Sequence, residues 1–152
     1  MENPLPVKKA GDLASLGPRM KWQFFEKLAA FVFEQNDYDV SMGIIKKFGC
    51  KKRFSKRQYD IIAENPRHVF AVDCKRWTGR RYKSSQLRVA AEKHTERCIL
   101  LKRDSEKEII PLIVTLMQEG MVVHDGVPIV PIEMLNTFLN NWEECGDEIR
   151  KI

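Results

Sequence analysis

The sequence of 152 residues has few of the residues that build zinc sites or disulfide frameworks. Its four cysteines (Cys50, Cys74, Cys98 and Cys145) form no C-x-x-C pair, and its three histidines form no H-E-x-x-H motif. This spacing excludes zinc chemistry from the expected functions. It also favours reduced thiols in an intracellular protein over a set of disulfides.

Long apolar runs are also missing. No stretch approaches the ~18 consecutive apolar residues that a membrane span requires, and residues 1–20 contain no apolar segment typical of a secretory signal. We therefore expect a soluble, cytoplasmic protein. Its hydrophobic content of 43% and aromatic content of 9% are sufficient for a folded core and exclude a disordered chain. The length fits one domain.

The positive charge is unevenly distributed. Lys and Arg number 26 against 21 acidic residues, a net charge of +5, and half of these cations fall in two windows without acids, 46–57 and 75–88. One such run is commonly a solvated face, but two runs beside a candidate site can together neutralise a phosphate backbone. Aromatic residues between the cations could stack on bases or simply anchor loops. Nucleic acid is therefore the first partner to test.

The pattern of apolar residues and turns predicts a flexible N-terminal arm over residues 1–17 and one domain over 18–152. Apolar residues at helical spacing and strand-like runs give the order α-β-β-β-α-β, followed by a small hairpin and a closing helix. The fold class is therefore α/β, with a central sheet flanked by helices. The expected elements are a helix over 18–35, a strand over 38–45, a basic loop over 46–57, a helix over 83–101, a buried strand over 109–117, a hairpin at Asp125-Gly126 and a helix from Pro131.

The most informative segment is a predicted antiparallel hairpin, in which residues 59–64 and 68–75 flank an Asn-Pro turn. With Pro66 and Arg67 as the loop, Asp60 lies across from Asp73, with Cβ atoms ~4.5–5.5 Å apart. Strand alternation places Lys75 on the same face as Asp73. A register slip of one residue would separate the two acids.

Two adjacent carboxylates and a lysine suit the hydrolysis of phosphodiester bonds. Like charges at this separation are costly unless a proton or a cation relieves the repulsion. Oxygen ligands favour Mg²⁺, which takes one or two carboxylates together with water and phosphate oxygens. A lysine beside them can stabilise phosphate charge or orient the attacking water. The alternative is an ordinary ion pair between Asp73 and Lys75 on an exposed strand.

These residues carry a family resemblance. Asp60, followed by Asp73-Cys74-Lys75, resembles the D…(D/E)-x-K signature of the PD-(D/E)XK nuclease superfamily. The segment 72–77 is similar to the corresponding strand of Mrr-type restriction endonucleases, and residues 22–26 resemble their first helix. Archaeal Holliday junction resolvases share this core. The sequence departs from the pattern with Tyr59 where proline is usual and with Asp73 where Glu or Gln is usual.

The resemblance extends from about residue 21 to 142 and implies a restriction-endonuclease-like αβββαβ core that cleaves DNA with Mg²⁺ or Mn²⁺ and leaves a 5′-phosphate. It implies a metal held by Asp60, Asp73 and Glu26, with Lys75 as the catalytic lysine, and Glu26 could instead be a solvated residue at the rim of its helix. The expected DNA contacts are Lys51, Lys52, Arg53, Lys56, Arg57, Arg76, Arg80, Arg81 and Lys83.

Several alternatives stay open. A junction resolvase would normally act as a homodimer, because two strands are cut symmetrically. A catalytically inert DNA-binding module could keep the fold and its basic face, and a protein-interaction domain would leave the basic runs unexplained. Gln86 is expected to be a surface residue rather than a helper of the site, and His94 is expected to be a hydrogen-bonded core histidine.

Overall fold

The computed structural model describes residues 22–50, 53–77, 84–116 and 120–152. Some of the sequence predictions concern residues outside these ranges. They are the N-terminal arm over 1–17, the first residues of the predicted first helix, and the candidate DNA contacts Lys51, Lys52, Arg80, Arg81 and Lys83.

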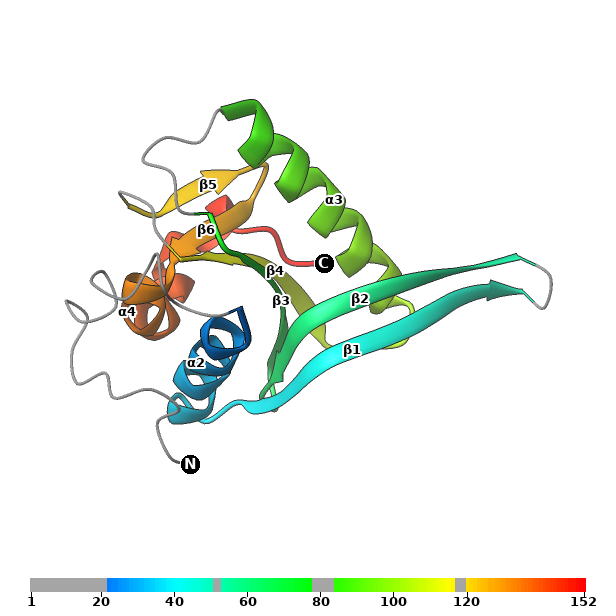
Figure 1. Ribbon diagram of the computed structural model, residues 1–152, viewed down its shortest axis with the longest axis horizontal. Coiled ribbons are helices and arrows are strands. Elements are labelled where there is room, and N and C mark those ends of the chain that lie inside the picture. The colour runs from blue at the N-terminus through cyan, green and yellow to red at the C-terminus, as the bar shows by residue number, and fades with distance from the viewer. Residues whose placement is uncertain (1–21, 51–52, 78–83, 117–119) are drawn as a thin grey trace.

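A mixed sheet of six strands forms the centre of the protein, in the order β1-β2-β3-β4-β6-β5 (Figure 1). Strands β3, β4 and β6 run parallel, whereas β1, β2 and β3 are joined antiparallel and β5 returns antiparallel to β6. The strands are β1 (Asp39–Cys50), β2 (Arg53–Glu64), β3 (His68–Lys75), β4 (Glu108–Thr115), β5 (Val122–His124) and β6 (Val127–Pro131).

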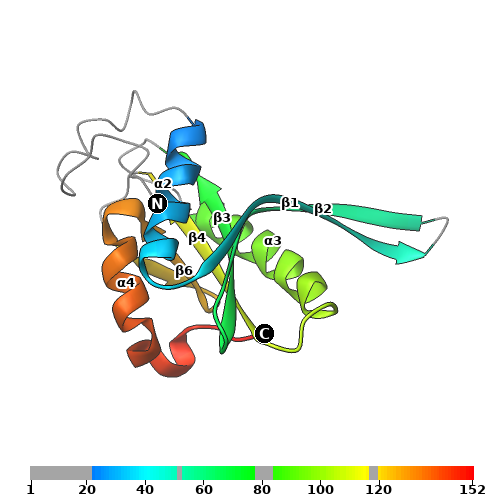
Figure 2. The ribbon, with the colours of Figure 1, turned by 90° about the horizontal axis from the view of Figure 1, so that it is seen from below.

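Helices cover both faces of this sheet. Helix α2 (Trp22–Gln35) and helix α4 (Leu135–Asn141) lie on one face, and helix α3 (Ser84–Lys102) lies on the other (Figures 1 and 2). Short 3₁₀ segments flank α4 at Ile132–Met134 and Trp142–Glu148. No helix in the described ranges is both long and apolar enough to cross a membrane.

The core divides into two layers because successive side chains of a strand point to opposite faces. Phe70, Val72 and Cys74 of β3 pack with α2 and α4, whereas Val69 and Ala71 pack toward α3. Strand β4 is buried along almost its whole length, as expected of a central strand covered by helices on both faces.

The structure confirms the α/β class and most of the predicted elements. The predicted helix over 83–101 is found at 84–102, and His94, the core histidine expected within it, is buried. The Asp125-Gly126 turn joins β5 to β6, with both residues at positive φ (50° and 82°), as a type I′ hairpin turn requires. Instead of one helix beginning at Pro131, the closing segment is α4 between two 3₁₀ segments.

The predicted basic loop over residues 46–57 is wrong. Strands β1 and β2 continue through it and stay paired from Asp39↔Glu64 to Cys50↔Arg53. Apolar side chains at alternate positions, including Ile44 and Phe48, give this segment a packing face. The cations between them obscured the strand pattern in the sequence. Figures 1 and 2 show the end of this hairpin projecting beyond the body of the protein.

The Asp125-Gly126 turn provides a test of the fold. A Cβ at Gly126 would lie 2.8 Å from Cβ of Arg150 and would occupy a backbone conformation with φ +82°. We expect Gly126→Ala to lower the free energy of unfolding by about 1–2 kcal/mol because of this strain, measured by urea denaturation. Gly120→Ala is the control, since a Cβ there meets nothing within 4 Å. Equal stability of the two variants would contradict the expectation.

Candidate active site

The site lies where β2 separates from β3. The two strands pair in the predicted register, from Glu64↔Val69 to Ile61↔Val72, and the ladder ends there. Asp60 immediately precedes Ile61 in β2, and its Oδ2 accepts a hydrogen bond of 2.8 Å from the backbone N–H of Cys74. The carboxylate therefore takes the place that a backbone carbonyl would occupy if the ladder continued.

The neighbouring strand is also interrupted at this point. Gly43 of β1 is opposite Asp60 in the register, and this position is the one step missing from the β1–β2 ladder. Gly43 has φ +61°, a conformation that glycine adopts most readily. Around this step the packing changes sides. Ile61 packs with the α2 layer, whereas Tyr59 packs with the α3 layer. The strands thus rotate at Asp60.

The environment of Asp60 disfavours its charged form. Partial burial raises the pKa of Asp60 to about 6, and the hydrogen bond from the Cys74 N–H opposes this rise. The Asp73 carboxylate raises the pKa further through its charge and a side-chain hydrogen bond, and Glu26 adds a smaller effect. The predicted proximity of Asp60 and Asp73 is therefore present in the structure.

Asp73 is almost buried and lies on the α3 face of the sheet. Its Oδ2 is 3.2 Å from Nζ of Lys75 and 3.7 Å from Nη1 of Arg97. That oxygen has no hydrogen-bond partner among the described residues. One buried oxygen thus faces two cations, and Lys75 lies on the same face as Asp73, as predicted.

Sequence reasoning missed Arg97. It lies in α3, 24 positions after Asp73, and its side chain and backbone both serve the site: the guanidinium approaches Asp73, and its carbonyl accepts a hydrogen bond of 2.6 Å from the Tyr59 hydroxyl. The only sequence signal is its spacing of three residues from the inward-facing His94, which places both on neighbouring parts of one helix surface.

Glu26 approaches the site from the opposite side of the sheet. It is half-buried in α2, and burial raises its pKa, opposed by a side-chain hydrogen bond with Trp22. Its charge raises the pKa values of Asp60 and Cys74, so the field of Glu26 reaches the point where β2 and β3 separate. The structure thus places Glu26 within electrostatic range of Asp60 and Cys74.

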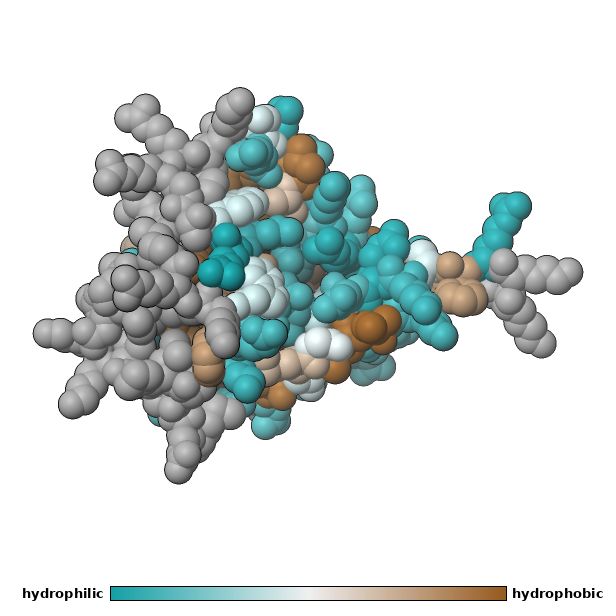
Figure 3. Space-filling view, viewed as in Figure 1, coloured by the Kyte–Doolittle hydropathy of each residue, from teal (hydrophilic) through white to brown (hydrophobic). Residues whose placement is uncertain are grey.

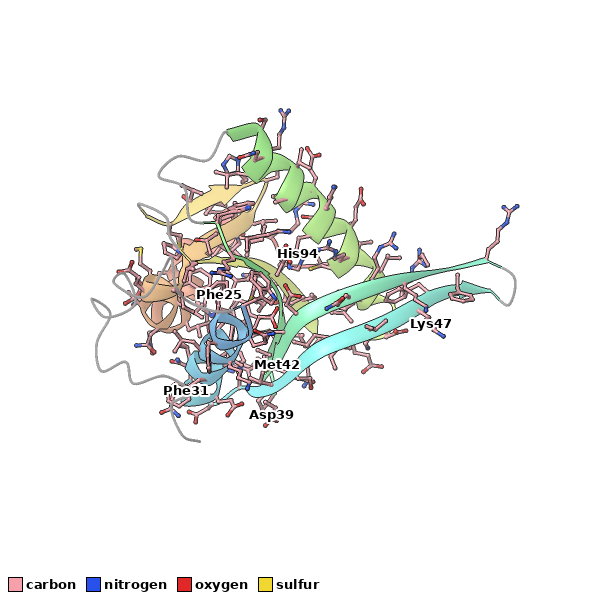
Figure 4. All side chains as sticks on the ribbon, viewed as in Figure 1. Phe25, Phe31, Asp39, Met42, Lys47 and His94 are labelled. Atoms are coloured by element: carbon pink, nitrogen blue, oxygen red, sulfur yellow. The ribbon has the colours of Figure 1, made fainter. Side chains whose placement is uncertain are left out.

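Two other groups near the site are structural. Burial raises the pKa of the Cys74 thiol well above its usual range, so this thiol is protonated at neutral pH and is no nucleophile. His94 points from α3 toward the sheet (Figure 4), where Nε2 lies 2.7 Å from the carbonyl oxygen of Ala71. Burial lowers the pKa of His94 and keeps it neutral. The prediction of a core histidine is confirmed.

Lys75 opens into a cleft of about 360 Å³ between the end of β3 and the first half of α3. This cleft gives solvent and a ligand access to one side of the Asp73–Lys75 pair. Gln86 lines it, although its side chain is exposed as expected for a surface residue. The lining residues are Lys75, Trp77, Ser85, Gln86, Val89, Ala90 and Lys93.

The candidate DNA contacts that the structure describes are on two elements. Arg53 and Lys56 are exposed and Arg57 is half-buried on the projecting part of β2, while Arg76 is exposed just after β3. Within the described residues, no group of three or more His, Cys, Asp or Glu side chains is arranged so that it could hold a metal ion. The carboxylates that the fold brings together are the pair Asp60 and Asp73.

The structure is an α/β fold with two neighbouring carboxylates. Comparison with known proteins gives the family of the chain. The family model of the nuclease-related domain, NERD, matches residues 21–115. This segment covers more than half of the chain, so the chain belongs to the NERD family. The matched segment contains Glu26, Asp60, Asp73, Lys75 and Arg97 and ends at the last residue of β4.

Three similar proteins have no assigned function in their descriptions. An uncharacterized protein of Archaeoglobus fulgidus (strain ATCC 49558) is 34% identical over 122 residues, which are 80% of this chain and 92% of that protein. The solved structure of protein VC1899 from Vibrio cholerae is similar in fold, with a TM-score of 0.53, 10% identity and 84% coverage of this chain. The solved structure of AF1548, a protein of unknown function, gives a TM-score of 0.47, 14% identity and 62% coverage. This chain spans 34% of VC1899 and 47% of AF1548.

The raised pKa of Asp60 leads to a prediction about stability. The folded pKa of about 6 lies above the unfolded value near 3.9, so the folded state binds the proton more tightly and wild-type stability falls as the pH rises between these values. Asp60→Asn removes this pH-dependent loss of stability, and its side-chain oxygen can still accept the hydrogen bond from the Cys74 N–H. We expect the variant to be more stable by about 1 kcal/mol at pH 7.5, after allowance for solvent screening of a partly exposed group.

Urea denaturation without divalent metal, at pH 7.5 and at pH 4, measures this difference. The gain should be present at pH 7.5 and mostly lost at pH 4, because Asp60 is then almost fully protonated in the folded state and about half protonated in the unfolded state. A variant that is less stable than wild type at pH 7.5 would show that the charge on the Asp60 oxygen stabilises the fold through the Cys74 N–H.

Proposed function

We propose that this chain is a cytoplasmic, metal-dependent DNA endonuclease that hydrolyses phosphodiester bonds in the manner of the Mrr-type enzymes it resembles. One observation carries the proposal: where β2 separates from β3, Asp60 acts on Asp73, and Asp73 pairs with Lys75, which lines a cleft. Membership of the nuclease-related family supports it. An inert binding module would gain nothing from negative charge held against phosphate.

Mg²⁺ or Mn²⁺ fits the donor set. Asp60 and Asp73 would hold the ion, with Glu26 as a further ligand, directly or through water. The fit rests on Asp60, whose charged form is disfavoured beside a second carboxylate and would be stabilised by a cation. Mg²⁺ needs only one or two protein carboxylates, because water and phosphate oxygens complete its shell. When bound, the ion would polarise a phosphate oxygen and lower the pKa of a bound water.

The protein groups have separate tasks in this proposal. The Lys75 ammonium is about one-third exposed and opens into the cleft, so its N–H groups can orient the attacking water or stabilise charge on the phosphate. Arg97 is a positioning residue, because it holds the same Asp73 oxygen from α3. Attack by water breaks the P–O3′ bond and leaves a 5′-phosphate and a 3′-hydroxyl, which takes a proton.

The direct test is cleavage of DNA. Purified protein is incubated with labelled duplex, four-way junction and single-stranded DNA, with Mg²⁺ or Mn²⁺ and with EDTA. We expect metal-dependent cutting that Asp73→Asn and Lys75→Met each reduce at least ~100-fold, since each removes a group that acts on the reacting phosphate or its metal. The control is Asp147→Asn, which changes an exposed carboxylate in the C-terminal 3₁₀ segment and should cut like wild type.

The preferred DNA substrate also distinguishes a junction resolvase from an Mrr-like enzyme. Preference for the four-way junction, together with a dimer in solution, would indicate a structure-selective resolvase, and preference for duplex would indicate an Mrr-like enzyme. Salt-sensitive binding without cutting in either metal would contradict the endonuclease and support a DNA-binding module.

The role of Glu26 has its own test. If Glu26 helps to hold the ion, Glu26→Gln should raise the Mg²⁺ concentration needed for half-maximal cutting, by roughly 10-fold or more. Glu34→Gln is the matched control, because Glu34 is also half-buried and lies two turns further along α2. Equal metal dependence of the two variants would assign Glu26 to the solvated rim of the helix.

A further inference from the structure

The projecting part of the β1–β2 hairpin, here called the ribbon, comprises residues 44–50 of β1 and 53–59 of β2. It pairs with no third strand, because the ladder between β2 and β3 ends at Ile61↔Val72. An isolated two-stranded hairpin is marginally stable in water. The stability of the ribbon therefore depends on its contacts with the rest of the protein.

Its anchorage lies on one face. Phe48 is buried against the end of α3, and the Tyr59 hydroxyl donates to the backbone carbonyl of Arg97 at 2.6 Å. The other face is open. Ile45 is 62% exposed and Phe54 is 54% exposed, and Nζ of Lys47 lies 5.3 Å from the centre of the Phe54 ring. Figure 4 shows Lys47 on the part of the ribbon outside the body.

Like charges are paired across the ribbon. Lys46 is directly opposite Arg57, and in the next step Lys47 is opposite Lys56. Like charges in directly opposed positions are destabilising. No acidic residue occurs between Val40 and Tyr59, and none of the ion pairs in the described residues involves a cation of the ribbon. Within the described residues no carboxylate offsets this repulsion, and a bound external anion would relieve it.

We infer that the ribbon enters the major groove of duplex DNA, and that double-stranded DNA is the substrate class of the site proposed above. This inference rests on the proposed function. Two strands ~4.8 Å apart fit a groove ~12 Å wide, which accepts a two-stranded β-ribbon. Lys47 and Lys56 project from the open face and can contact phosphates of the groove, whereas Lys46 and Arg57 are half-buried on the face that packs toward α3. A single strand has no groove for the ribbon to enter.

The ribbon also fixes where these contacts fall. Lys56 and Arg53 are four and seven residues before Asp60 on the same strand. At ~3.3 Å per residue they lie ~13 and ~23 Å from Asp60, the length of ~4–7 base pairs along the duplex. The bound duplex must therefore extend ~7 base pairs to one side of the cut.

A second copy of this chain is the competing occupant. Strand β1 is the edge of the sheet, and exposed edges can pair with another chain. Pairing two ribbons would bring their lysines and arginines together with no acid between them, which opposes this arrangement. Figure 3 shows hydrophilic side chains over most of the visible surface around the ribbon, rather than a continuous apolar patch for a protein partner.

Binding of the full chain to labelled 24-base-pair duplex and 24-nucleotide single-stranded DNA tests the inference, without divalent metal and over a range of salt. The ribbon variant is Lys47→Gln/Lys56→Gln. We expect its duplex affinity to fall ~10- to 100-fold and its salt slope to become shallower by about 2, because two phosphate contacts are lost. Its affinity for single-stranded DNA should change less than threefold.

The matched control is Lys27→Gln/Arg67→Gln, which removes the same charge from exposed positions in α2 and the β2–β3 turn. It should bind duplex like wild type. Lys47→Arg/Lys56→Arg should retain binding, and thermal denaturation confirms that each variant is folded.

Three results would overturn the inference: unchanged duplex affinity in the ribbon variant, an equal loss on single-stranded DNA, or a wild-type dimer in sedimentation that the ribbon variant converts to monomer. Cutting is scored separately with Asp73→Asn. If wild type does not cut but the ribbon variant loses duplex binding, the endonuclease proposal fails, and only the binding of the ribbon to duplex DNA stands.

Discussion

The hydrogen bond from the Cys74 N–H to the Asp60 carboxylate determines the rest of this structure. A buried backbone N–H must have a partner, and along most of β3 a neighbouring strand supplies it. At Cys74 the carboxylate supplies it instead. Strand β2 is therefore free to diverge from β3 on the N-terminal side of Ile61 while it stays paired with β1, and the side chain that ends the ladder lies at the centre of the candidate site.

This arrangement has an electrostatic cost. Asp60 lies in a partly buried place beside Asp73, with Glu26 acting from the other face of the sheet, and burial raises its pKa to about 6. The protein places Lys75 and Arg97 next to Asp73 but directs neither at Asp60. Negative charge is thus concentrated on one residue pair and positive charge surrounds it, a distribution that favours a cation between the carboxylates and a phosphate outside them.

The sequence was sufficient to predict the parts of the site that depend on local rules. The Asn-Pro turn fixes the register of β2 and β3, and from that register the proximity of Asp60, Asp73 and Lys75 follows. The Asp125-Gly126 turn and the helix over 84–102 are local in the same sense. Arg97 was missed because its contact with Asp73 crosses from a helix to the sheet, and no pattern of single residues encodes that distance.

The ribbon was missed for a different reason. Its cations and glycines are typical of a loop, and their paired positions become visible only when β1 and β2 are aligned as strands. The two windows without acids therefore differ in the structure. Window 46–57 lies on the paired strands β1 and β2, whereas much of window 75–88 lies outside the described residues.

Because Asp60 and the ribbon cations belong to one strand, the distance between them is set by the rise of an extended backbone. A flexible basic loop could hold DNA at many positions relative to the carboxylates. A paired strand, supported by Phe48 and by the Tyr59 hydrogen bond to α3, would hold it at one position. The step at Gly43 and Asp60 then sets the direction of the ribbon relative to the cleft, so the break in the ladder both forms the site and aligns the surface that would deliver DNA to it.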